Sequence, residues 1–267
     1  MNESSSSQSR PCVLVFSGLD PSGGAGIQAD IEAIGATGAH ALSVITALTV
    51  QDNDKVYAVN PVDNAIIARQ ADVLIQKIPV AAIKIGIVGN RANAEAIADV
   101  IRRLRLKQPD LPVILDTVLG SGHGFSLSDG MPEYALSPLI GLATLVTPNL
   151  PEAKRLYPES DDIGEQAKYL RSLGAMDVLI KGGHGNDANS VVNCWFGAGG
   201  LKEWKWTRIA GEFHGTGCTL AAAIAGYLAC GMTMEMALEK GQELTQVALA
   251  NAFSIADGQK IPGRQIC

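Results

Sequence analysis

Short apolar runs rich in β-branched residues alternate along the chain with stretches whose apolar residues recur at helical spacing. Residues 13–16 form the first run, Ile27, Ile31 and Ile34 follow at helical spacing, and residues 44–48 form the second run. Glycine, proline or aspartate bounds each segment, as expected where a chain turns. The pattern predicts βαβ units, in which a helix connects two parallel strands.

The same alternation continues toward the C-terminal end. Further strands are expected at residues 82–88, 112–115, 142–146 and 178–181, followed by two strands of edge type at 191–196 and 201–207. Helices are expected at 63–78, at 92–106, from residue 150, at 164–173, and in two closing segments of which the first covers 221–229. We therefore predict an α/β fold, a three-layer αβα sandwich with a mostly parallel central sheet. Ligands of such folds bind at the carboxyl ends of the strands, so the candidate chemistry is sought there.

Length and charge narrow the class of protein. The chain has 267 residues, of which 47% are apolar, and this fits one large α/β domain over residues 11–267. Residues 1–10 are polar and Ser-rich, without the apolar core of a signal peptide, so we expect a disordered tail. The longest stretch of small apolar residues, 219–230, is too short to span a bilayer. The net charge of −6 argues against binding to nucleic acids or anionic membranes.

Five cysteines are scattered along the sequence, without a C-x-x-C pair and without a histidine at ligand spacing. An odd number of isolated cysteines is typical of a reducing compartment and argues against structural zinc. The expected location is therefore the cytoplasm.

A glycine-rich segment, residues 17–26, joins the first predicted strand to the first helix. Its glycines would let the backbone approach a ligand closely, and the start of the helix would offer free N–H groups to an anion. Residues 24–29 also match the loose dinucleotide pattern G-x-G-x-x-A, but residues 20–22 separate them from the strand, which disfavours that alternative. A Walker A loop is excluded because the chain contains no Gly-Lys-Ser/Thr sequence. A turn without a ligand remains a further alternative.

A second glycine-rich turn, Gly215-Thr216-Gly217, precedes an Ala-rich helix. Backbone N–H groups of such a turn converge on one point that the helix dipole makes positive, which suits the charge on a transferred phosphoryl group. Cys218 follows in the first helical turn, where the dipole is expected to favour the thiolate. A single cysteine on an apolar helix is more often a small buried side chain, but the preceding turn favours a catalytic role.

Charged side chains mark the ends of three later strands. Asn149 and Glu152 have the spacing of a capping box, so helix capping alone could explain both. Glu152 and Asp116 each follow a predicted strand and could also hold Mg²⁺ together with phosphate oxygens. Lys181 ends another strand and could reach a nucleotide phosphate, although this signal alone is weak.

Taken in order, several segments resemble those of the hydroxymethylpyrimidine/phosphomethylpyrimidine kinases of thiamine synthesis, and the likeness spans nearly the whole chain. The segments are Gly18 with residues 20–30, then 43–51, 147–152, 181–184 and 214–220. The resemblance implies a ribokinase-like fold, ATP and Mg²⁺ as cofactors, and phosphorylation of the hydroxymethylpyrimidine, its monophosphate or both. It also suggests a homodimer.

The same resemblance implies the role of the second turn. Members of the ribokinase-like fold usually have Gly-Ala-Gly-Asp at the catalytic turn, with the aspartate as base. Gly215, Thr216, Gly217 and Cys218 take that place here, as in the pyrimidine branch. Cys218 is therefore expected to accept the proton of the substrate hydroxymethyl group, with the three preceding residues around the transferring phosphate.

The resemblance also assigns the binding residues. It places Gln51 against the aminopyrimidine, whose exocyclic amine and ring nitrogen match the donor and acceptor of a carboxamide, although Gln51 could simply be a polar end of an edge strand. The other residues assigned to the substrate pocket are Gly18, Thr49 and Asp30, with an indirect role for Asp30 left open. The residues assigned to ATP are Lys181, Thr216 and Asn149, and those assigned to Mg²⁺ are Glu152 and Asp116.

One segment departs from the family pattern. Many relatives have a stretch containing Ala-Lys-Ser-Gly after the motif equivalent to residues 116–119, whereas this chain has Gly-Ser-Gly-His-Gly at 120–124. The missing lysine could weaken the second phosphorylation, or a protonated His123 could take part instead. The glycine-rich loop at residues 120–126 is still expected to close over the site.

Two other functions stay open. A pyridoxal kinase shares the fold and phosphorylates a hydroxymethyl group on a small aromatic ring, although Gln51 and the Gly-Thr-Gly-Cys turn favour the pyrimidine. A non-catalytic pyrimidine-binding protein would bind the same ring without releasing ADP.

Overall fold

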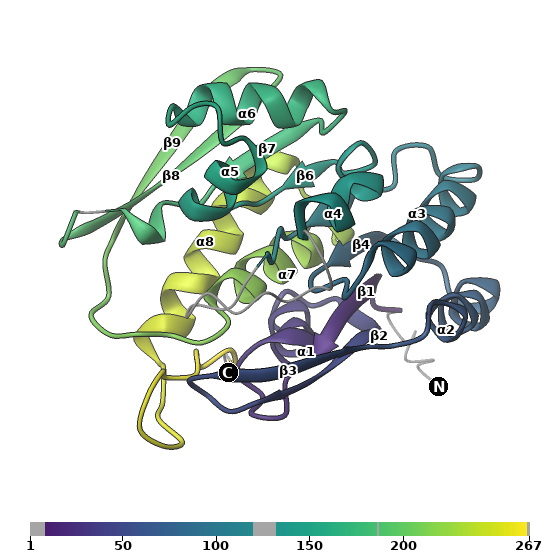
Figure 1. Ribbon diagram of the computed structural model, residues 1–267, viewed down its shortest axis with the longest axis horizontal. Helices are drawn as coiled ribbons and strands as arrows, with labels where there is room; N and C mark the ends of the chain where they lie inside the picture. The colour runs from purple at the N-terminus through teal and green to yellow at the C-terminus, as the bar shows by residue number, and fades with distance from the viewer. Residues whose placement is uncertain (1–8, 120–131, 186, 266–267) are drawn as a thin grey trace, which may run out of the picture.

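The structure is a computed structural model that describes residues 9–119, 132–185 and 187–265. Most of the expected N-terminal tail and the expected loop at 120–126 lie outside these residues. The remaining chain forms one mixed sheet between two layers of helices (Figure 1). The α/β sandwich expected from the apolar pattern is therefore confirmed.

The strand order of the sheet is β3-β2-β1-β4-β5-β6-β7-β8-β9. The strands are β1 (Cys12–Leu19), β2 (His40–Gln51), β3 (Val56–Pro61), β4 (Ala82–Ile85), β5 (Val113–Leu115), β6 (Leu145–Val146), β7 (Asp177–Ile180), β8 (Ser190–Gly197) and β9 (Gly200–Thr207). Neighbours from β2 through β7 pair in parallel, while β3, β8 and β9 are antiparallel to their neighbours. The chain order reverses between β1 and β4, and such a switch point opens a crevice at the carboxyl ends of the strands.

Helices cover both faces of the sheet (Figure 1). One face carries α1 (Gly26–Ala36), α7 (Thr216–Ala229) and α8 (Met234–Ala250). The other carries α2 (Asn64–Lys77), α3 (Arg91–Arg105), α4 (Pro132–Ile140), α5 (Leu150–Leu156) and α6 (Ile163–Ser172). A short 3-10 helix, Gly182–His184, follows β7.

Strand β1 shows why the apolar runs in the sequence are continuous and do not alternate between apolar and polar residues. Val13 and Val15 belong to the core under α1, α7 and α8, whereas Leu14 and Phe16 belong to the core on the opposite face. All four side chains are fully buried. Each such burial stabilises the fold by about 1.5–3 kcal/mol relative to an exposed side chain, so a central parallel strand is apolar on both faces.

Helix α7 lies close against the sheet because its inward positions are small. Residues 220–226 are all buried, and most of them are alanine. The helix is flanked by α1 and α8 and contributes to the same core as β1, β4 and β5. This packing fixes the N-terminal end of α7 at one place on the sheet.

Two elements were not expected from the sequence. Strand β3 is short and mixed in polarity, ends in Pro61, and lies at the sheet edge beside β2. Helix α4 contains Pro138, a residue that normally argues against a helix interior. The two strands of edge type are present, but only β9 is at the edge, since β8 pairs with both β7 and β9. Among the described residues, no helix has the length and apolar character needed to cross a membrane.

Candidate active site

The loop between β1 and α1 is organised around Asp20, whose side chain is nearly buried. Its Oδ1 accepts hydrogen bonds from the backbone N and the Oγ of Ser22, both at 2.8 Å, and its Oδ2 accepts one from the backbone N of Ala25 at 2.7 Å. His214 Nε2 lies 2.8 Å from the same Oδ2. Burial alone would raise the pKa of Asp20, but the bonds from His214 and Ser22 lower it. The Asp20 carboxylate thus forms hydrogen bonds within its own loop and connects this loop to the segment before α7.

The second glycine-rich turn lies directly against this loop. Gly215 caps α7 in the left-handed region, at φ 83°. Helix α7 begins at Thr216, earlier than the expected range 221–229, and Cys218 lies in its first turn as expected. A Cβ atom at Gly215 would overlap the carbonyl oxygen of Gly24. Both glycine-rich segments therefore meet at the carboxyl edge of the sheet, although they come from opposite ends of the chain.

The residues expected to bind the substrate lie next to these two glycine-rich segments. A Cβ atom at Gly26 would overlap the carbonyl oxygen of Gly18, so the loop folds back over the end of β1. Thr49 Oγ1 donates to the carbonyl of Leu19 at 2.6 Å and accepts from Gln51 Nε2 at 2.8 Å. Contacts therefore run without interruption from Gln51 through the end of β1 to the turn before α7.

Cys218 lies in the first turn of α7, but its environment does not favour the thiolate. Burial raises the pKa of its thiol to about 11, and the carboxylates of Asp116 and Asp30 act in the same direction. The ammonium of Lys84 and a hydrogen bond to the backbone of Gly26 oppose these effects without overcoming them. The expectation that the helix dipole makes Cys218 a thiolate at neutral pH is therefore wrong, because burial outweighs the dipole.

Asp116 and Lys181 form a buried ion pair at the ends of β5 and β7. Their Oδ1 and Nζ atoms are 2.7 Å apart, and the Oγ1 of Thr147 donates to the same carboxylate oxygen at 3.1 Å. Burial would raise the pKa of Asp116, but Lys181 and Lys84 hold it below its ordinary value. A Cβ atom at Gly217 would lie 3.1 Å from Lys181 Nζ, which places this cation beside the turn before Cys218.

Glu152 has a structural role and an unusual acidity. It forms the expected capping box of α5, in which Asn149 Oδ1 accepts from Glu152 N and Glu152 Oε2 accepts from Asn149 N, both at 2.8 Å. Thr117 Oγ1 donates to the same Oε2 at 3.2 Å. Burial raises the pKa of Glu152 to about 7, and the nearby carboxylate of Asp116 adds to the increase while Lys181 opposes it.

The fit of these two carboxylates to Mg²⁺ follows from their charge. No cluster of three or more His, Cys, Asp or Glu side chains suited to a metal occurs in the described part of the chain. Mg²⁺ commonly uses one or two protein carboxylates and takes its other ligands from water and substrate phosphates. Mutual repulsion between Asp116 and Glu152 in a buried place is the condition that a divalent cation would relieve.

Asp30, one of the expected substrate residues, lies in the interior of the protein. Its side chain is fully buried and pairs with the fully buried ammonium of Lys84 at 2.7 Å. An indirect role of Asp30 in substrate binding therefore stays a prediction. Lys84 was missed, although a lysine inside an apolar central strand calls for a buried partner and could have been found by that signal.

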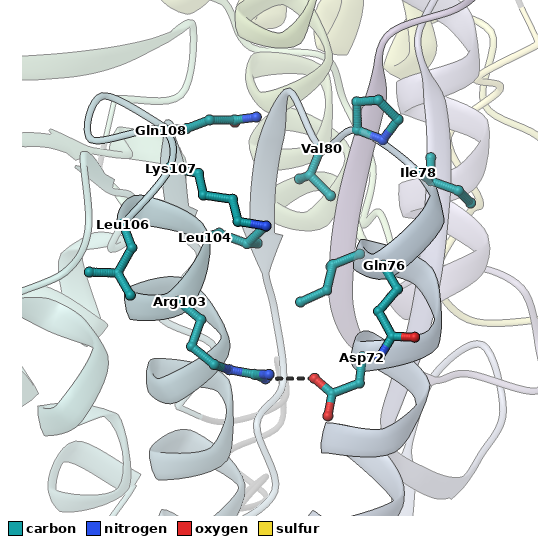
Figure 2. Close-up of a pocket in the computed structure, with 11 residues that line it drawn as sticks. Asp72, Gln76, Ile78, Val80, Arg103, Leu104, Leu106, Lys107 and Gln108 are labelled. Carbon is teal, nitrogen blue, oxygen red and sulfur yellow. Dashed lines mark hydrogen bonds and ion pairs between the residues drawn. The ribbon is translucent and has the colours of Figure 1, made fainter.

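One pocket of the structure lies away from this site. Figure 2 shows this pocket between α2 and α3, with Ile78 and Val80 before β4 and Leu106 after α3 among its lining residues. Its volume is about 530 Å³. It lies at the amino ends of β4 and β5, opposite the glycine-rich turns. Among the labelled side chains, only Asp72 and Arg103 form an ion pair, and no glycine is among the described residues that line the pocket.

Comparison with known proteins gives a consistent result at the level of sequence. Residues 20–262 match the family described as phosphomethylpyrimidine kinase. The hydroxymethylpyrimidine/phosphomethylpyrimidine kinase of Mycobacterium bovis is 35% identical, over 93% of this chain and 91% of that protein. The thiamine biosynthesis bifunctional protein ThiED of Geobacter sulfurreducens is also 35% identical over 93% of this chain, which spans only 51% of that longer protein.

Solved structures agree with the fold. The pyridoxal kinase of Bacillus subtilis, solved as an ADP complex, has a TM-score of 0.83 at 28% identity and covers 96% of this chain and 98% of its own. The phosphomethylpyrimidine kinase of Clostridium difficile has a TM-score of 0.75 at 31% identity and covers 89% of this chain and 98% of its own. The expectation of a ribokinase-like fold is thereby confirmed.

The sequence match begins in the loop that Asp20 organises and extends beyond α8, so it includes most of the first glycine-rich segment, all of the second and the charged strand ends. The identity of 35% to the Mycobacterium bovis kinase extends over 93% of this chain. The chain therefore belongs to the phosphomethylpyrimidine kinase family, a family of phosphotransferases that act on hydroxymethylpyrimidine or its phosphate.

Proposed function

We propose that this protein transfers the γ-phosphoryl group of ATP to the hydroxyl of 4-amino-5-hydroxymethyl-2-methylpyrimidine, to the monophosphate of that alcohol, or to both. The observation that carries the proposal is the contact between the Gly215 turn and the Gly24 loop at the end of β1. Through this contact, the amides at the start of α7 would lie next to the expected substrate residues Gly18 and Gln51. Amides that converge on a transferring phosphate stabilise the charge that develops there.

The nucleotide would lie on the side of the turn that faces β6 and β7. Lys181, Thr216 and Asn149 are the residues we assign to it. Lys181 Nζ lies near Gly217, and its backbone N donates to Pro148 O at 2.8 Å, which brings the start of α5 to the same place. The ADP complex of the Bacillus subtilis pyridoxal kinase supports nucleotide use by a chain of this fold.

Asp116 and Glu152 are the residues that would hold Mg²⁺, which would neutralise phosphate charge when bound. Lys181 contributes a fixed cation beside the same carboxylates, since Asp116 and Glu152 both raise its pKa against the effect of burial. The lysine therefore stays charged and can compensate phosphate charge at neutral pH.

The ring would be recognised on the opposite side of the turn. The carboxamide of Gln51 presents a donor and an acceptor side by side, which matches the exocyclic amine and adjacent nitrogen of an aminopyrimidine. The hydrogen bonds from Gln51 to Thr49 and from Thr49 to Leu19 O fix the orientation of this carboxamide. A Cβ atom at Gly18 would lie 3.3 Å from Ile87 Cδ1, so the absence of a side chain lets the end of β1 pack close to Ile87.

Cys218 is the proposed base. In the reaction the substrate oxygen forms a bond to the γ-phosphorus, the bond from that phosphorus to the ADP oxygen breaks, and the hydroxyl proton moves to Cys218 Sγ. A base contributes little to a loose phosphoryl transition state, so the positioning of the reactants supplies most of the rate acceleration. With a pKa of about 11 the thiol is mostly protonated at neutral pH, so only its small thiolate fraction can accept the proton there.

We place the enzyme in a reducing compartment, the cytoplasm, because Cys12, Cys194, Cys218 and Cys230 are all free thiols. A homodimer is part of the same proposal, and light scattering of the purified protein measures it.

The substrate is tested by ADP release with four alcohols: hydroxymethylpyrimidine, its monophosphate, pyridoxal and ribose. We expect the highest kcat/KM with one or both pyrimidines. Pyridoxal kinase activity is the second candidate because of the structural similarity to the Bacillus subtilis enzyme. A higher kcat/KM for pyridoxal than for either pyrimidine would replace our proposal with that alternative, and ADP release with none of the four would refute both.

A further inference from the structure

Arg264, near the C-terminal end of the described chain, has a buried guanidinium with an exposed fraction of 1%. Its Nε donates to Thr219 Oγ1 at 2.7 Å, and its Nη1 lies 3.2 Å from Glu32 Oε2. Its Nη2 donates to the carbonyl oxygen of Gly24. The planar guanidinium group of Arg264, called its fork below, therefore contacts α7, α1 and the glycine-rich loop that precedes α1.

Two of these contacts lead into the phosphate-binding turn. Thr219 Oγ1, which accepts from Arg264, donates in turn to the carbonyl of Gly215 at 2.9 Å. The carbonyl of Gly24, the other acceptor, is the atom against which Gly215 lies. Arg264 thus holds both partners of the loop contact on which the phosphate site depends.

A buried guanidinium of this kind is costly for stability alone. Removing a cation from water costs several kcal/mol. Among the described residues, the carboxylate that pairs with Arg264 is that of Glu32, which keeps 22% of its side chain exposed. An apolar side chain of similar volume would fill the space at lower cost. The contacts indicate that the charge serves the geometry of the two loops.

The segment that carries Arg264 is itself held to the site. His214 N donates to Lys260 O and Lys260 N donates to Glu212 O, both at 2.9 Å. Asn53 Nδ2, beyond the end of β2, donates to the carbonyls of Asp257 and Gln259 at 2.9 and 3.1 Å. Residues 257–264 therefore contact the loops after β1, β2 and β9 at once.

We propose that Arg264 is a positioning residue for phosphoryl transfer. Its fork sets the separation and orientation of the Gly24 loop and the Gly215 turn, so that the amides at the start of α7 point at the migrating phosphate. The inference rests on the proposed function of that turn. Because Arg264 acts through the geometry of the transition-state donors, its loss lowers kcat more than it raises the KM for the alcohol.

The test compares R264M, which keeps the apolar volume of the arginine stem, with R105M. Arg105 is a matched control because it also donates to a carbonyl, that of Leu111, and to a threonine hydroxyl, that of Thr144, but on α3 away from the site. We expect R264M to lose about ten- to hundredfold in kcat with little change in KM. R105M is expected to lower the unfolding temperature while its kcat stays that of the wild type.

A second variant covers the case in which R264M does not fold. T219V removes the hydroxyl that relays Arg264 to Gly215, whereas T219S keeps it. We expect T219V to lower kcat and T219S to retain it, and the effects of R264M and T219V to be smaller together than their sum, because both break one connection. Wild-type kcat in T219V, or full additivity of the two effects, would overturn the inference.

Amide hydrogen exchange separates this inference from the proposed function. Exchange at residues 23–26 and 215–219 should be faster in R264M than in R105M, whether or not any of the four alcohols is a substrate. Unchanged exchange in both segments would refute the positioning role. Absence of kinase activity in the wild type, with faster exchange in R264M, would refute the proposed function while leaving Arg264 as the residue that sets the two loops.

Discussion

The sulfur of Cys218 can accept a proton only as a thiolate, and burial raises the pKa of this thiol to about 11. Below that pH the thiolate fraction rises about tenfold for each pH unit. We therefore expect the wild-type kcat to increase with pH from 7 to 10, and the kcat of C218A to change little over the same range. Stopped-flow or steady-state ADP release across this pH range measures both.

The size of the loss of kcat in C218A shows whether Cys218 acts as a base. General-base help is typically a factor of about 10² to 10⁴, so C218A should keep measurable activity and its KM for the alcohol, with the largest loss at high pH. C230A is a control, since Cys230 is an exposed thiol at the opposite end of α7. Parallel pH profiles for C218A and the wild type would remove the thiol from the mechanism.

The ion pair between Lys84 and Asp30 is a further property of single residues that can be measured. K84M leaves the carboxylate of Asp30 buried without its cation, and we expect a loss of about 3–5 kcal/mol in the free energy of unfolding. The double variant K84M/D30L removes both charges and should recover most of that loss. Urea denaturation monitored by circular dichroism gives these values.

An exposed pair provides the comparison for this prediction. Arg103 and Asp72 also lie 2.7 Å apart, but their side chains are 48% and 36% exposed, so R103M should cost at most about 1 kcal/mol. We expect K84M and R103M to lose unequal amounts of the free energy of unfolding, because the Lys84–Asp30 pair is buried away from water. Equal losses in the two variants, or a K84M/D30L variant no more stable than K84M, would contradict this prediction.

Helix α5 shows how one element can carry a structural and a functional role. Asn149 caps the helix through its Oδ1, and serine is nearly as good a cap as asparagine. We expect N149S to keep the wild-type free energy of unfolding and N149A to lose about 1 kcal/mol. If the carboxamide also contacts ATP, both variants will show a higher KM for ATP; an unchanged KM in N149S would leave Asn149 with the capping role alone.

The elements that were predictable are those whose pattern is local. The run at 13–16 and the isoleucines at 27, 31 and 34 specify β1 and α1 because their periodicity needs no knowledge of distant segments. Strand β3 was missed because a short edge strand of mixed polarity depends on pairing with β2. Helix α4 was missed because Pro138 lies within it.

At the level of the whole molecule, the site depends on contacts between segments far apart in the sequence. The glycine-rich motifs at 17–26 and 215–217 could be found from the sequence, but their meeting could only be expected from the fold class and the family resemblance. The pairing of Asp30 with Lys84 and the fork of Arg264 are long-range and follow no period. The acidity of Cys218 was predicted wrongly because burial at a helix start is a property of the folded chain.

The contact between Gly215 and the Gly24 loop is the central element of this account, and a pair of alanine variants tests it most directly. Gly215 and Gly231 both have left-handed backbones, at φ 83° and 86°, near the two ends of α7. A Cβ atom would overlap Gly24 O at position 215, whereas nothing lies within 4 Å of one at position 231. Each variant should lose about 1 kcal/mol of stability from the strained backbone alone.

The decisive measurement is the single-turnover rate of phosphoryl transfer from ATP to hydroxymethylpyrimidine in G215A and G231A, each at a temperature where it is fully folded. We predict a loss of about a hundredfold or more in G215A and the wild-type rate in G231A, because only G215A forces the two loops apart. A wild-type rate in folded G215A, or equal losses in the two variants, would contradict the claim that this loop contact forms the phosphate site.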